Sequence, residues 1–479
     1  MLTLLPLLLA APPNVLFIAV DDLRPEIASF GVEMMHTPNI DRLAARGVRF
    51  ENAYCNVPVC GASRASLMTG VRPSQQRFRA FDCYAEKQAP GAIPLHAHFK
   101  ANGYTVRGGG KIFHNTGDSR DGWSQPVWVP KNAPRYARQE NIDAAKSNPS
   151  AKKRGAVTEA AEVPDNFYKD GKLADWAVEQ VDELATTDKP FFLAVGFWKP
   201  HLPFIAPQRD WDRYGPESPQ QYFVPPDIPR QAIHSSGEIR AYAGVPKKGI
   251  LPLPLAEHLI HGYRACITYT DRQIGRVLDA LDASGEADNT IIVLWGDHGW
   301  NLGEHSMWCK HCCFETSMRT PLIVAAPFRS DISGGEAPQA LVEFTDIYPT
   351  LCDLASLQRP DGKHPENKPK QLDGESLVPL MTGEVDSLRP WAIGRYGLGD
   401  TIIDGRYRYT EYRTAGGKLT GTMLFDHETD PEEINNIVQD ESVADVVEKL
   451  KKQLNGNKGR DGKSAGPDRK PRAKSKQAA

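Results

Sequence analysis

The longest apolar runs of the chain have the length of buried β-strands. Four of them show no alternation of polar and apolar residues: 14–20, 190–197, 290–295 and 321–326. Such runs are typical of central parallel strands that are covered on both faces. Two further segments, at 48–54 and 104–107, also predict strands.

Segments with helical periodicity alternate with these runs. Helices are expected at residues 60–69, 95–102, 172–186, 257–283 and 443–454. Gly70 and Gly285 follow two of them, at the position where a glycine commonly ends a helix. The alternation predicts an α/β fold in which helices sandwich a large, mostly parallel central sheet.

The pattern changes towards the C-terminus. Residues 14–373 are expected to form the large α/β domain, in which the polar segment of about 120–164 is an insertion on the ligand side. Short polar and apolar alternation, as in 407–412, predicts a smaller C-terminal subdomain over 374–455 that is built on an antiparallel sheet.

The two ends of the chain differ from its globular middle. Residues 1–13 are apolar, end in small residues and are too short to span a bilayer, which predicts a signal segment and export to the periplasm or the medium. No other stretch is apolar enough for an integral membrane helix in the mature chain. Residues 456–479 lack an apolar face and are expected to be a basic disordered tail.

Composition narrows the class of protein. The 57 Lys and Arg residues against 60 Asp and Glu give a formal charge of −3, so no overall field attracts nucleic acid. Eight cysteines among 479 residues do not make a disulfide scaffold. Cys309, His311, Cys312 and Cys313 are spaced too tightly for a usual zinc site, and a disulfide involving one of these cysteines is expected instead.

Charged side chains come directly after two of the predicted strands. Asp21 and Asp22 end the run at 14–20, and Asp297 and His298 follow the run at 290–295. Ligands of open α/β sheets bind at the carboxyl ends of the strands. Adjacent carboxylates at such a point repel each other unless a cation is present, so a metal site is one interpretation. A solvated turn or a helix cap is the alternative.

Cys60 is predicted at the first turn of a short helix, with Arg64 on the same face one turn later. The free N–H groups of the helix start point the same way, so the pair predicts an anion site around a sulfur atom. The alternative is a buried structural cysteine followed by a surface arginine.

Three further positions carry candidate chemistry. The glycines at 108–110 let the backbone turn tightly and approach a ligand, and Lys111 and His114 follow at once. A plain loop is equally compatible with three glycines. His201 follows the strand at 190–197, a position where a lone histidine is more often structural than catalytic.

Several of these segments resemble the sulfatase family. Cys60-Gly61-Ala62-Ser63-Arg64 and the following Leu67-Met68-Thr69-Gly70 are similar to the signature Cys-x-Pro/Ala-x-Arg and its Leu-x-Thr-Gly ending. The usual proline is Ala62 here. The resemblance runs from Asn14 to about Asn436 and is closest to the iduronate-2-sulfatase branch. Further matching segments are Asp21-Asp22-Leu23-Arg24-Pro25, Gly110-Lys111-Ile112-Phe113-His114, Lys199-Pro200-His201-Leu202-Pro203-Phe204, Gly296-Asp297-His298-Gly299 and Trp308-Cys309-Lys310.

The resemblance implies an alkaline-phosphatase-like fold and the hydrolysis of sulfate esters on a sulfated carbohydrate, by exo or endo action. It implies that a formylglycine-generating enzyme oxidises Cys60 to formylglycine, whose hydrate supplies the nucleophilic oxygen. It also implies one Ca²⁺ ion, a hard cation that suits carboxylate ligands. The implied metal ligands are residue 60 with Asp21, Asp22, Asp297 and His298.

The resemblance assigns roles to the remaining candidates as well. Arg64, Lys111 and Lys310 are expected to stabilise negative charge on the transferring sulfuryl group. His114 is the candidate base for breakdown of the sulfated intermediate, and His201 the candidate acid that protonates the leaving alcohol oxygen.

Two other functions stay open on the sequence alone. A phosphonate or phosphate monoester or diester hydrolase of the same superfamily would keep the metal carboxylates and change the specificity. A non-catalytic binder of sulfated glycans would leave Cys60 unmodified, although a binder has no need for His201 as an acid.

Overall fold

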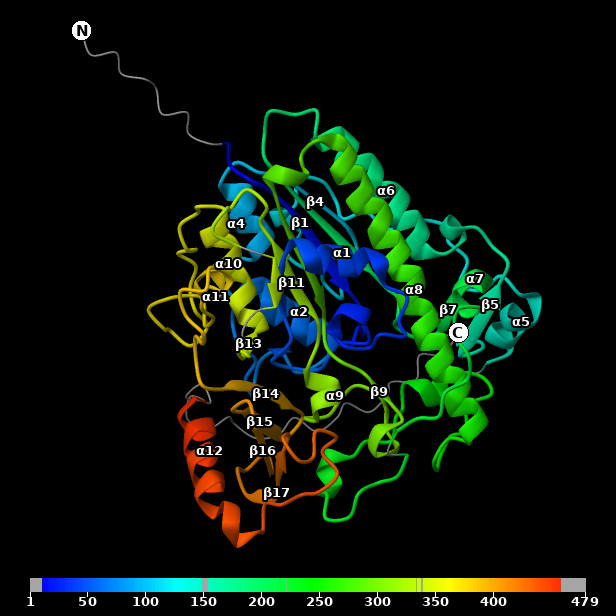
Figure 1. The fold of residues 1–479 in the computed structure, drawn as a ribbon, viewed down its shortest axis with the longest axis vertical. Coiled ribbons are helices and arrows are strands. Elements are labelled where there is room, and N and C mark those ends of the chain that lie inside the picture. The colour runs from blue at the N-terminus through cyan, green and yellow to red at the C-terminus, as the bar shows by residue number, and fades with distance from the viewer. Residues whose placement is uncertain (1–10, 149–153, 221, 333, 337–338, 458–479) are drawn as a thin grey trace, which may run out of the picture.

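The computed structural model describes residues 11–148, 154–220, 222–332, 334–336 and 339–457. A seven-stranded sheet runs through the large domain (Figure 1). The order of its strands is β12 (Gly335–Glu336), β2 (Val48–Phe50), β11 (Leu322–Ala325), β8 (Thr290–Gly296), β1 (Asn14–Val20), β6 (Phe191–Phe197) and β4 (Thr105–Gly110).

The centre of this sheet is parallel. β8, β1, β6 and β4 all run in the same direction, whereas β11 is antiparallel to both β8 and β2. This confirms the mostly parallel sheet that the apolar runs predict. Because the carboxyl ends of four neighbouring strands meet at one edge, the loops after these strands share that edge.

Helices cover both faces of the sheet. On one face lie α2 (Cys60–Thr69), α4 (Leu95–Ala101) and α10 (Ile347–Leu354); on the other lie α1 (Pro38–Arg46), α6 (Lys169–Leu184) and α8 (Leu253–Ser284). In Figure 1, α6 and α8 run side by side. All seven residues of β1 are buried, alternating between the two cores. Burial of each large apolar side chain stabilises the fold by about 1.5–3 kcal/mol, so the burial of β1 fixes its place at the centre of the sheet.

A second, smaller sheet lies beside the large domain. It is antiparallel and contains β14 (Ala392–Tyr396), β15 (Gly399–Ile403), β16 (Tyr407–Arg413) and β17 (Leu419–Asp426) in that order. Helix α12 (Ala444–Asn457) packs on it through Leu450 and Leu454. The predicted antiparallel C-terminal subdomain is therefore confirmed (Figure 1). The predicted tail is helical at Gly456 and Asn457, and the rest of it lies outside the described residues, as do residues 1–10 of the signal segment.

Short elements complete the fold: α3 (Ala85–Gln88), α7 (Gln208–Trp211), α9 (Glu315–Met318), α11 (Val378–Met381), β3 (Ala53–Tyr54), β9 (Asn301–Leu302), β10 (Trp308–Cys309) and β13 (Val342–Glu343). The strand expected at 48–54 is thus two short strands, β2 and β3. No helix of the described residues combines the length and the apolar character needed to cross a membrane.

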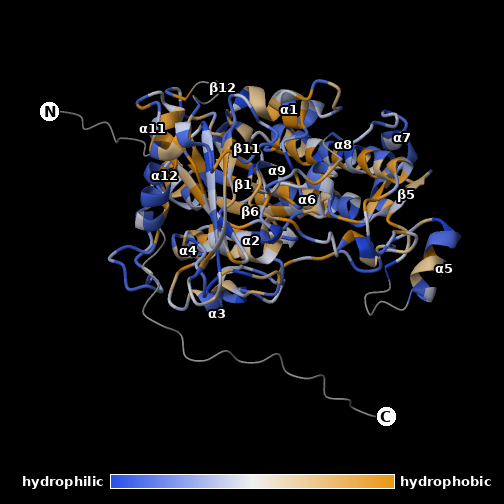
Figure 2. Cartoon of the chain, turned by 90° about the horizontal axis from the view of Figure 1, so that it is seen from below, coloured by the Kyte–Doolittle hydropathy of each residue, from blue (hydrophilic) through white to orange (hydrophobic). Residues whose placement is uncertain are grey.

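The segment at 120–164 is more ordered than its polar composition predicts. It contains α5 (Gln139–Ser147) and β5 (Thr158–Ala161), and β5 pairs in parallel with β7 (Phe204–Pro207). Figure 2 shows α5 standing at the edge of the molecule, away from the apolar residues around β1 and β6. The pairing partner of β5 is distant in sequence, which is why local patterning did not reveal this strand.

The glycines at 108–110 are not a turn, because they form the end of β4. A Cβ atom at Gly108 would lie 2.6 Å from the Trp123 ring, and one at Gly109 would lie 2.1 Å from the Trp176 ring. The absence of side chains therefore serves the packing of two tryptophans. Only Gly110 has a positive φ, +77°, where the chain leaves the strand towards Lys111.

The disulfide expected around residue 309 is absent. All eight cysteines belong to the described part of the chain, and each is a buried free thiol. The sulfur of Cys312 lies 3.0 Å from the hydroxyl oxygen of Ser317 instead.

Candidate active site

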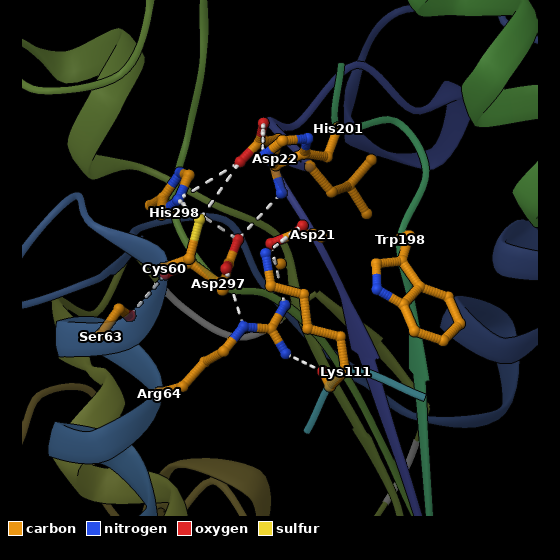
Figure 3. A network of polar contacts seen from close by, with 12 residues as sticks. Asp21, Asp22, Cys60, Ser63, Arg64, Lys111, Trp198, His201, Asp297 and His298 are labelled. Carbon is orange, nitrogen blue, oxygen red and sulfur yellow. Dashed lines mark hydrogen bonds and ion pairs between the residues drawn. The ribbon is translucent and has the colours of Figure 1, made fainter. Parts of the chain in front are cut away.

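Two acidic segments meet at the carboxyl edge of the sheet. Asp21 and Asp22 directly follow β1, and Asp297 and His298 directly follow β8, its neighbour in register. The backbone N–H of Asp22 donates a hydrogen bond of 2.9 Å to Oδ1 of Asp297. All four residues are fully buried. Figure 3 shows their side chains turned towards one another.

Cys60 is the first residue of α2 and faces this acidic centre. Its sulfur lies 3.2 Å from Nε2 of His298 and 3.7 Å from Oδ1 of Asp22 (Figure 3). One turn later, the hydroxyl of Ser63 donates to the backbone oxygen of Asp297, which fastens the helix start to the end of β8. Burial, and then the charge of Asp21, raise the pKa of the Cys60 thiol far above its usual value.

The side chain of Arg64 is buried among the carboxylates of the site. Its Nε donates to Asp297 over 2.9 Å and its Nη2 to Asp21 over 3.2 Å, while Nη1 donates to the backbone oxygens of Lys111 and Ile112. Its side chain has no exposed area. The guanidinium therefore holds the carboxylates in place, and it does not line the cavity described below.

Two lysines bring positive charge to the same point. Nζ of Lys111 lies 2.5 Å from Asp21, and Nζ of Lys310 lies 2.9 Å from Asp22. Burial opposes the charge on both lysines, but the carboxylates outweigh it, so the pKa of each lies above its usual value. Burial raises the pKa of Asp21, but Lys111, His201, Arg64 and the hydrogen bond with Asp297 together outweigh it, so this pKa is well below its usual value. Both lysines are therefore cationic at neutral pH.

His201 comes from the loop after β6. Its Nδ1 lies 2.7 Å from the carbonyl oxygen of Leu202, which can only accept, so Nδ1 carries a hydrogen and donates it. Nε2 lies 3.3 Å from Glu238 and 3.9 Å from Asp22. Asp170, near the start of α6, accepts hydrogen bonds from the backbone N–H groups of residues 198 and 199 and so holds this loop.

Glu238 is a site residue that sequence reasoning missed. It lies in the irregular segment between α7 and α8, and its carboxylate joins His201 to Lys310, whose Nζ is 3.1 Å away. Burial raises the pKa of Glu238, but Lys310 and His201 together outweigh this effect and hold the pKa well below its usual value. No motif or periodicity surrounds this residue, so the sequence offered no signal for it.

His114 follows Lys111 by one short turn and points into the cavity. Among the described residues, its Nδ1 has no hydrogen-bond partner. Burial, reinforced by the charge of Lys111, lowers the pKa of His114 to about 3. The imidazole is therefore neutral at physiological pH and can accept a proton.

These residues surround one cavity of about 540 Å³. Six of the ten residues expected at the site line it: Asp21, Cys60, Lys111, His114, His201 and Lys310. The other four, Asp22, Arg64, Asp297 and His298, lie behind its floor and contact the lining residues. The structure thus brings together all ten, with Glu238 added.

The donor atoms at the floor suit a divalent cation. Ligand atoms of Asp21, Asp22, Cys60 and His201 lie within 4.8 Å of one another, and so do those of Cys60, Asp297 and His298. Nδ1 of His298 donates to the carbonyl oxygen of residue 299 over 2.9 Å, so the lone pair of Nε2 faces the carboxylates. Lone pairs and carboxylate oxygens at such distances repel unless a cation lies between them. Oxygen-rich sets of this kind favour hard ions.

Comparison with known proteins gives a consistent picture. A family model described as Sulfatase matches residues 13–357. A protein named "Sulfatase" from Formosa agariphila is 35% identical over 478 residues, which cover 92% of this chain and 86% of that protein. Human iduronate 2-sulfatase is 32% identical over 389 residues, or 72% of this chain and 70% of that enzyme.

Solved structures share the whole architecture. A 2-O GAG sulfatase superposes with a TM-score of 0.72 at 25% identity and covers 94% of this chain and 93% of its own. The phosphonate monoester hydrolase of Agrobacterium radiobacter gives a TM-score of 0.70 at 23% identity, over 93% of this chain and 95% of its own. The second likeness concerns the fold alone.

Proposed function

This chain belongs to the sulfatase family, whose enzymes hydrolyse sulfate esters, and we propose that it acts on a sulfated carbohydrate through a formylglycine made from Cys60 and a bound Ca²⁺ ion. The observation that carries the proposal is the position of Cys60. It starts α2 at the floor of the cavity, between the carboxylate and imidazole groups on one side and two buried lysines on the other.

An unmodified thiol does not explain the site. The pKa of Cys60 is raised by burial, so the side chain stays a neutral thiol, and a neutral thiol is a poor nucleophile. When present, the hydrated formylglycine supplies the nucleophilic oxygen and the cation polarises a sulfate oxygen. The residues of the chain supply the rest of the chemistry.

Charge stabilisation falls to Lys111 and Lys310. Both ammonium groups are fixed by carboxylates and line the cavity, so they face the place where negative charge gathers on the transferring sulfuryl group. Preorganised charges of this kind need no reorganisation during the reaction. Arg64 acts through Asp21 and Asp297, which it holds in position.

The two histidines take the proton steps. Nε2 of His201 points towards the cavity and is the candidate donor to the leaving alcohol oxygen. Burial lowers the pKa of His114 to about 3, so its imidazole is neutral and His114 is the candidate proton acceptor. One acid and one base with different environments meet the needs of a hydrolysis in two steps.

The names of related proteins and the volume of the cavity both support a carbohydrate substrate. One relative is named iduronate 2-sulfatase, and one structural neighbour is described as a 2-O GAG sulfatase. A cavity of about 540 Å³ is in the range that accommodates small ligands such as a single sugar unit.

The first experiment is mass spectrometry of the tryptic peptide 50–64 from protein made in its natural host. Cys60 is expected as the aldehyde, which indicates conversion by a formylglycine-generating enzyme during maturation. Cys55 in the same peptide is the unmodified control. A thiol at position 60 in active protein would contradict the proposed mechanism.

Turnover of an aryl sulfate, an aryl phosphate and an aryl phosphonate separates the candidate activities. We expect the sulfate to be preferred and Cys60→Ala to abolish its turnover. A preference for the phosphonate or phosphate would assign the chain to the other activity found on this fold.

The cation and the export signal have their own tests. Dialysis against a chelator is expected to remove activity, and Ca²⁺ is expected to restore it better than Mg²⁺ or Zn²⁺. Equal rescue by Mg²⁺ would overturn the choice of ion. We also propose that the apolar segment 1–13 directs export, which N-terminal sequencing of protein from the natural host checks.

A further inference from the structure

One wall of the cavity carries three cations that the proposed chemistry does not use. They are Arg135, Arg154 and Lys169, and each lines the same cavity as Cys60. Arg135 and Arg154 belong to the segment before β5, and Lys169 is the first residue of α6. We call these three residues the basic wall.

Lys169 has an unusual position within the basic wall. Its Nζ lies 5.3 Å from the centre of the Trp198 ring, and it forms no hydrogen bond or ion pair with another described residue. Burial lowers its pKa, Asp170 acts in the opposite direction, and the charge of Arg135 lowers it further. Lys169 and Arg135 are both solvent-exposed and close enough to influence each other's charge, so an anion bound beside them would interact with two cations.

Arg154 links the basic wall to the reacting centre. Its guanidinium lies 5.1 Å from the centre of the Tyr242 ring, and its Nη1 donates to the backbone oxygen of Glu238 over 2.7 Å. Arg135 acts electrostatically on the same tyrosine. The orientation of Arg154 is thus fixed before any ligand arrives.

The carboxylates near the basic wall are already engaged. Asp170 accepts two backbone N–H groups of the loop at 198–199, and Glu238 pairs with His201 and Lys310. Arg154 approaches the Glu238 carboxylate only to 4.0 Å. These two carboxylates are thus committed to other groups, whereas Lys169 lines the cavity without an ion-pair partner among the described residues.

We propose that Arg135, Arg154 and Lys169 form a second anion subsite, which binds a carboxylate or a second sulfate on the sugar that carries the reacting sulfate or on its neighbour. This inference rests on the proposed function and narrows its substrate to a glycan with two acidic groups. Trp198 also lines the cavity: its ring centre lies 5.3 Å from Nζ of Lys169, and Figure 3 shows it beside Lys111, so it connects the basic wall with the reacting centre.

The test compares substrates with one and two acidic groups. An aryl sulfate uses the reacting centre alone, whereas a monosulfated disaccharide with a uronic acid and a disulfated hexosamine would use both subsites. The variant is the double substitution Arg135→Gln and Lys169→Met. The matched control is Lys172→Met, which removes the same charge from the same helix at a residue outside the cavity lining.

For the double variant, we expect kcat/KM of a diacidic substrate to fall about tenfold, mainly through KM, since two solvent-accessible charge pairs are lost. The loss is expected to shrink at high salt, because accessible charges are screened. Turnover of the aryl sulfate is expected to change less than about twofold, the range of a surface charge change. The control variant is expected to behave as the wild type.

The two diacidic substrates distinguish the sources of the anion. A loss for the uronic acid substrate alone assigns a carboxylate to the basic wall, and a loss for the disulfated hexosamine alone assigns a sulfate. If the double variant changes kcat/KM equally for all substrates, or changes it for none of them, the proposed subsite is wrong.

Binding to the Cys60→Ala variant separates this inference from the proposed function. Calorimetric titration with either diacidic glycan needs no turnover, and binding is expected to weaken when the basic wall is substituted as well. If the wild type hydrolyses no sulfate ester but still binds through the basic wall, the proposed function fails and the subsite stands. If hydrolysis is observed but substitution of the basic wall does not weaken binding, the subsite proposal is wrong and the proposed function stands.

Discussion

At the scale of single residues, the stability of the site depends on buried side chains of opposite charge that neutralise one another. Arg64 lies between Asp21 and Asp297, and all three side chains have no exposed area. A buried ion pair costs desolvation when it forms, but removal of one partner leaves an uncompensated charge. The carboxylates that face the proposed cation therefore depend on an arginine that does not itself line the cavity.

Replacement of Arg64 tests this dependence. We expect Arg64→Met to lower the free energy of unfolding by about 3–5 kcal/mol, because buried Asp297 loses its guanidinium partner and buried Asp21 keeps only Lys111. The control is Arg46→Met, which breaks a solvent-accessible pair with Asp282 and is expected to cost at most about 1 kcal/mol. Urea unfolding measures both. Equal losses in the two variants would show that the buried carboxylates do not depend on Arg64 for stability.

His114 makes stability depend on pH. Its pKa of about 3 in the folded chain lies below the value of about 6.5 expected when unfolded. Between these values only the unfolded chain binds the proton, so this histidine lowers stability as the pH falls from 6.5 towards 3. From pH 7 to pH 5 the loss is at most about 2 kcal/mol.

Unfolding of the wild type and of His114→Gln at pH 7 and pH 5 checks this contribution. The variant is expected to lose less stability on acidification than the wild type. His427→Gln is the contrasting control. Burial opposes the charge of His427, but Glu433 outweighs it and raises the pKa, so its contribution is present at acidic pH and is lost as the pH rises. The same sign in both variants would contradict the assignment.

At the scale of elements, small residues decide how closely the strands and helices of the site approach their neighbours. A Cβ at Gly61 in α2 would lie 2.0 Å from the backbone oxygen of Phe81, and one at Gly109 in β4 would lie 2.1 Å from Trp176. Trp176 stacks on Trp128 at 5.4 Å and has little room to move. The glycines of β4 therefore set the position from which Lys111 reaches Asp21.

Substitution of Gly109 by alanine tests the packing. We expect a loss of about 1–3 kcal/mol in the free energy of unfolding, typical of an overpacked core, together with lower activity because Lys111 is displaced. Gly215→Ala is the control, since no atom lies within 4 Å of a Cβ there and its φ is not positive. Its unfolding free energy is expected to stay within about 0.5 kcal/mol of the wild type. A neutral Gly109→Ala would show that Trp176 can move aside.

At the scale of the whole molecule, the C-terminal sheet is fastened to the large domain by buried charges. Arg408 of β16 pairs with Glu315 of α9 and, over 2.8 Å, with Glu433. Glu433 also accepts the backbone N–H of Glu315. The segment at 309–318, which carries Lys310, is thereby held between the two domains.

Replacement of Arg408 is expected to loosen this junction. Arg408→Leu removes the buried guanidinium that Glu315 and Glu433 share and is expected to cost about 3–5 kcal/mol. The control Arg406→Leu lies two residues away and breaks exposed pairs with Asp426 and Glu428, for which less than about 1 kcal/mol is expected. Thermal unfolding followed by circular dichroism measures the difference. A loss no larger than that of the control would show that the domains do not depend on this contact.

The sequence by itself determined the central strands and the charged residues at their carboxyl ends. The predicted runs at 14–20 and 290–295 match β1 and, to within one residue, β8, because a strand covered on both faces must be apolar throughout. The pairs Asp21-Asp22 and Asp297-His298 after these strands were recognisable for a related reason, since a strand end and its next residues are neighbours in the chain. The family resemblance also rests on such short, contiguous segments.

Only the tertiary structure decided which distant segments meet. Glu238 reaches His201 and Lys310, the carboxylate partners of Arg64 lie in two other segments, and the basic wall gathers residues from two sides of β5. The free cysteines and the strand β5 likewise depend on neighbours that are remote in sequence. Local patterns encode which face of an element is buried, whereas contacts between side chains arise only when the packed elements fix their distances and their shared electric field.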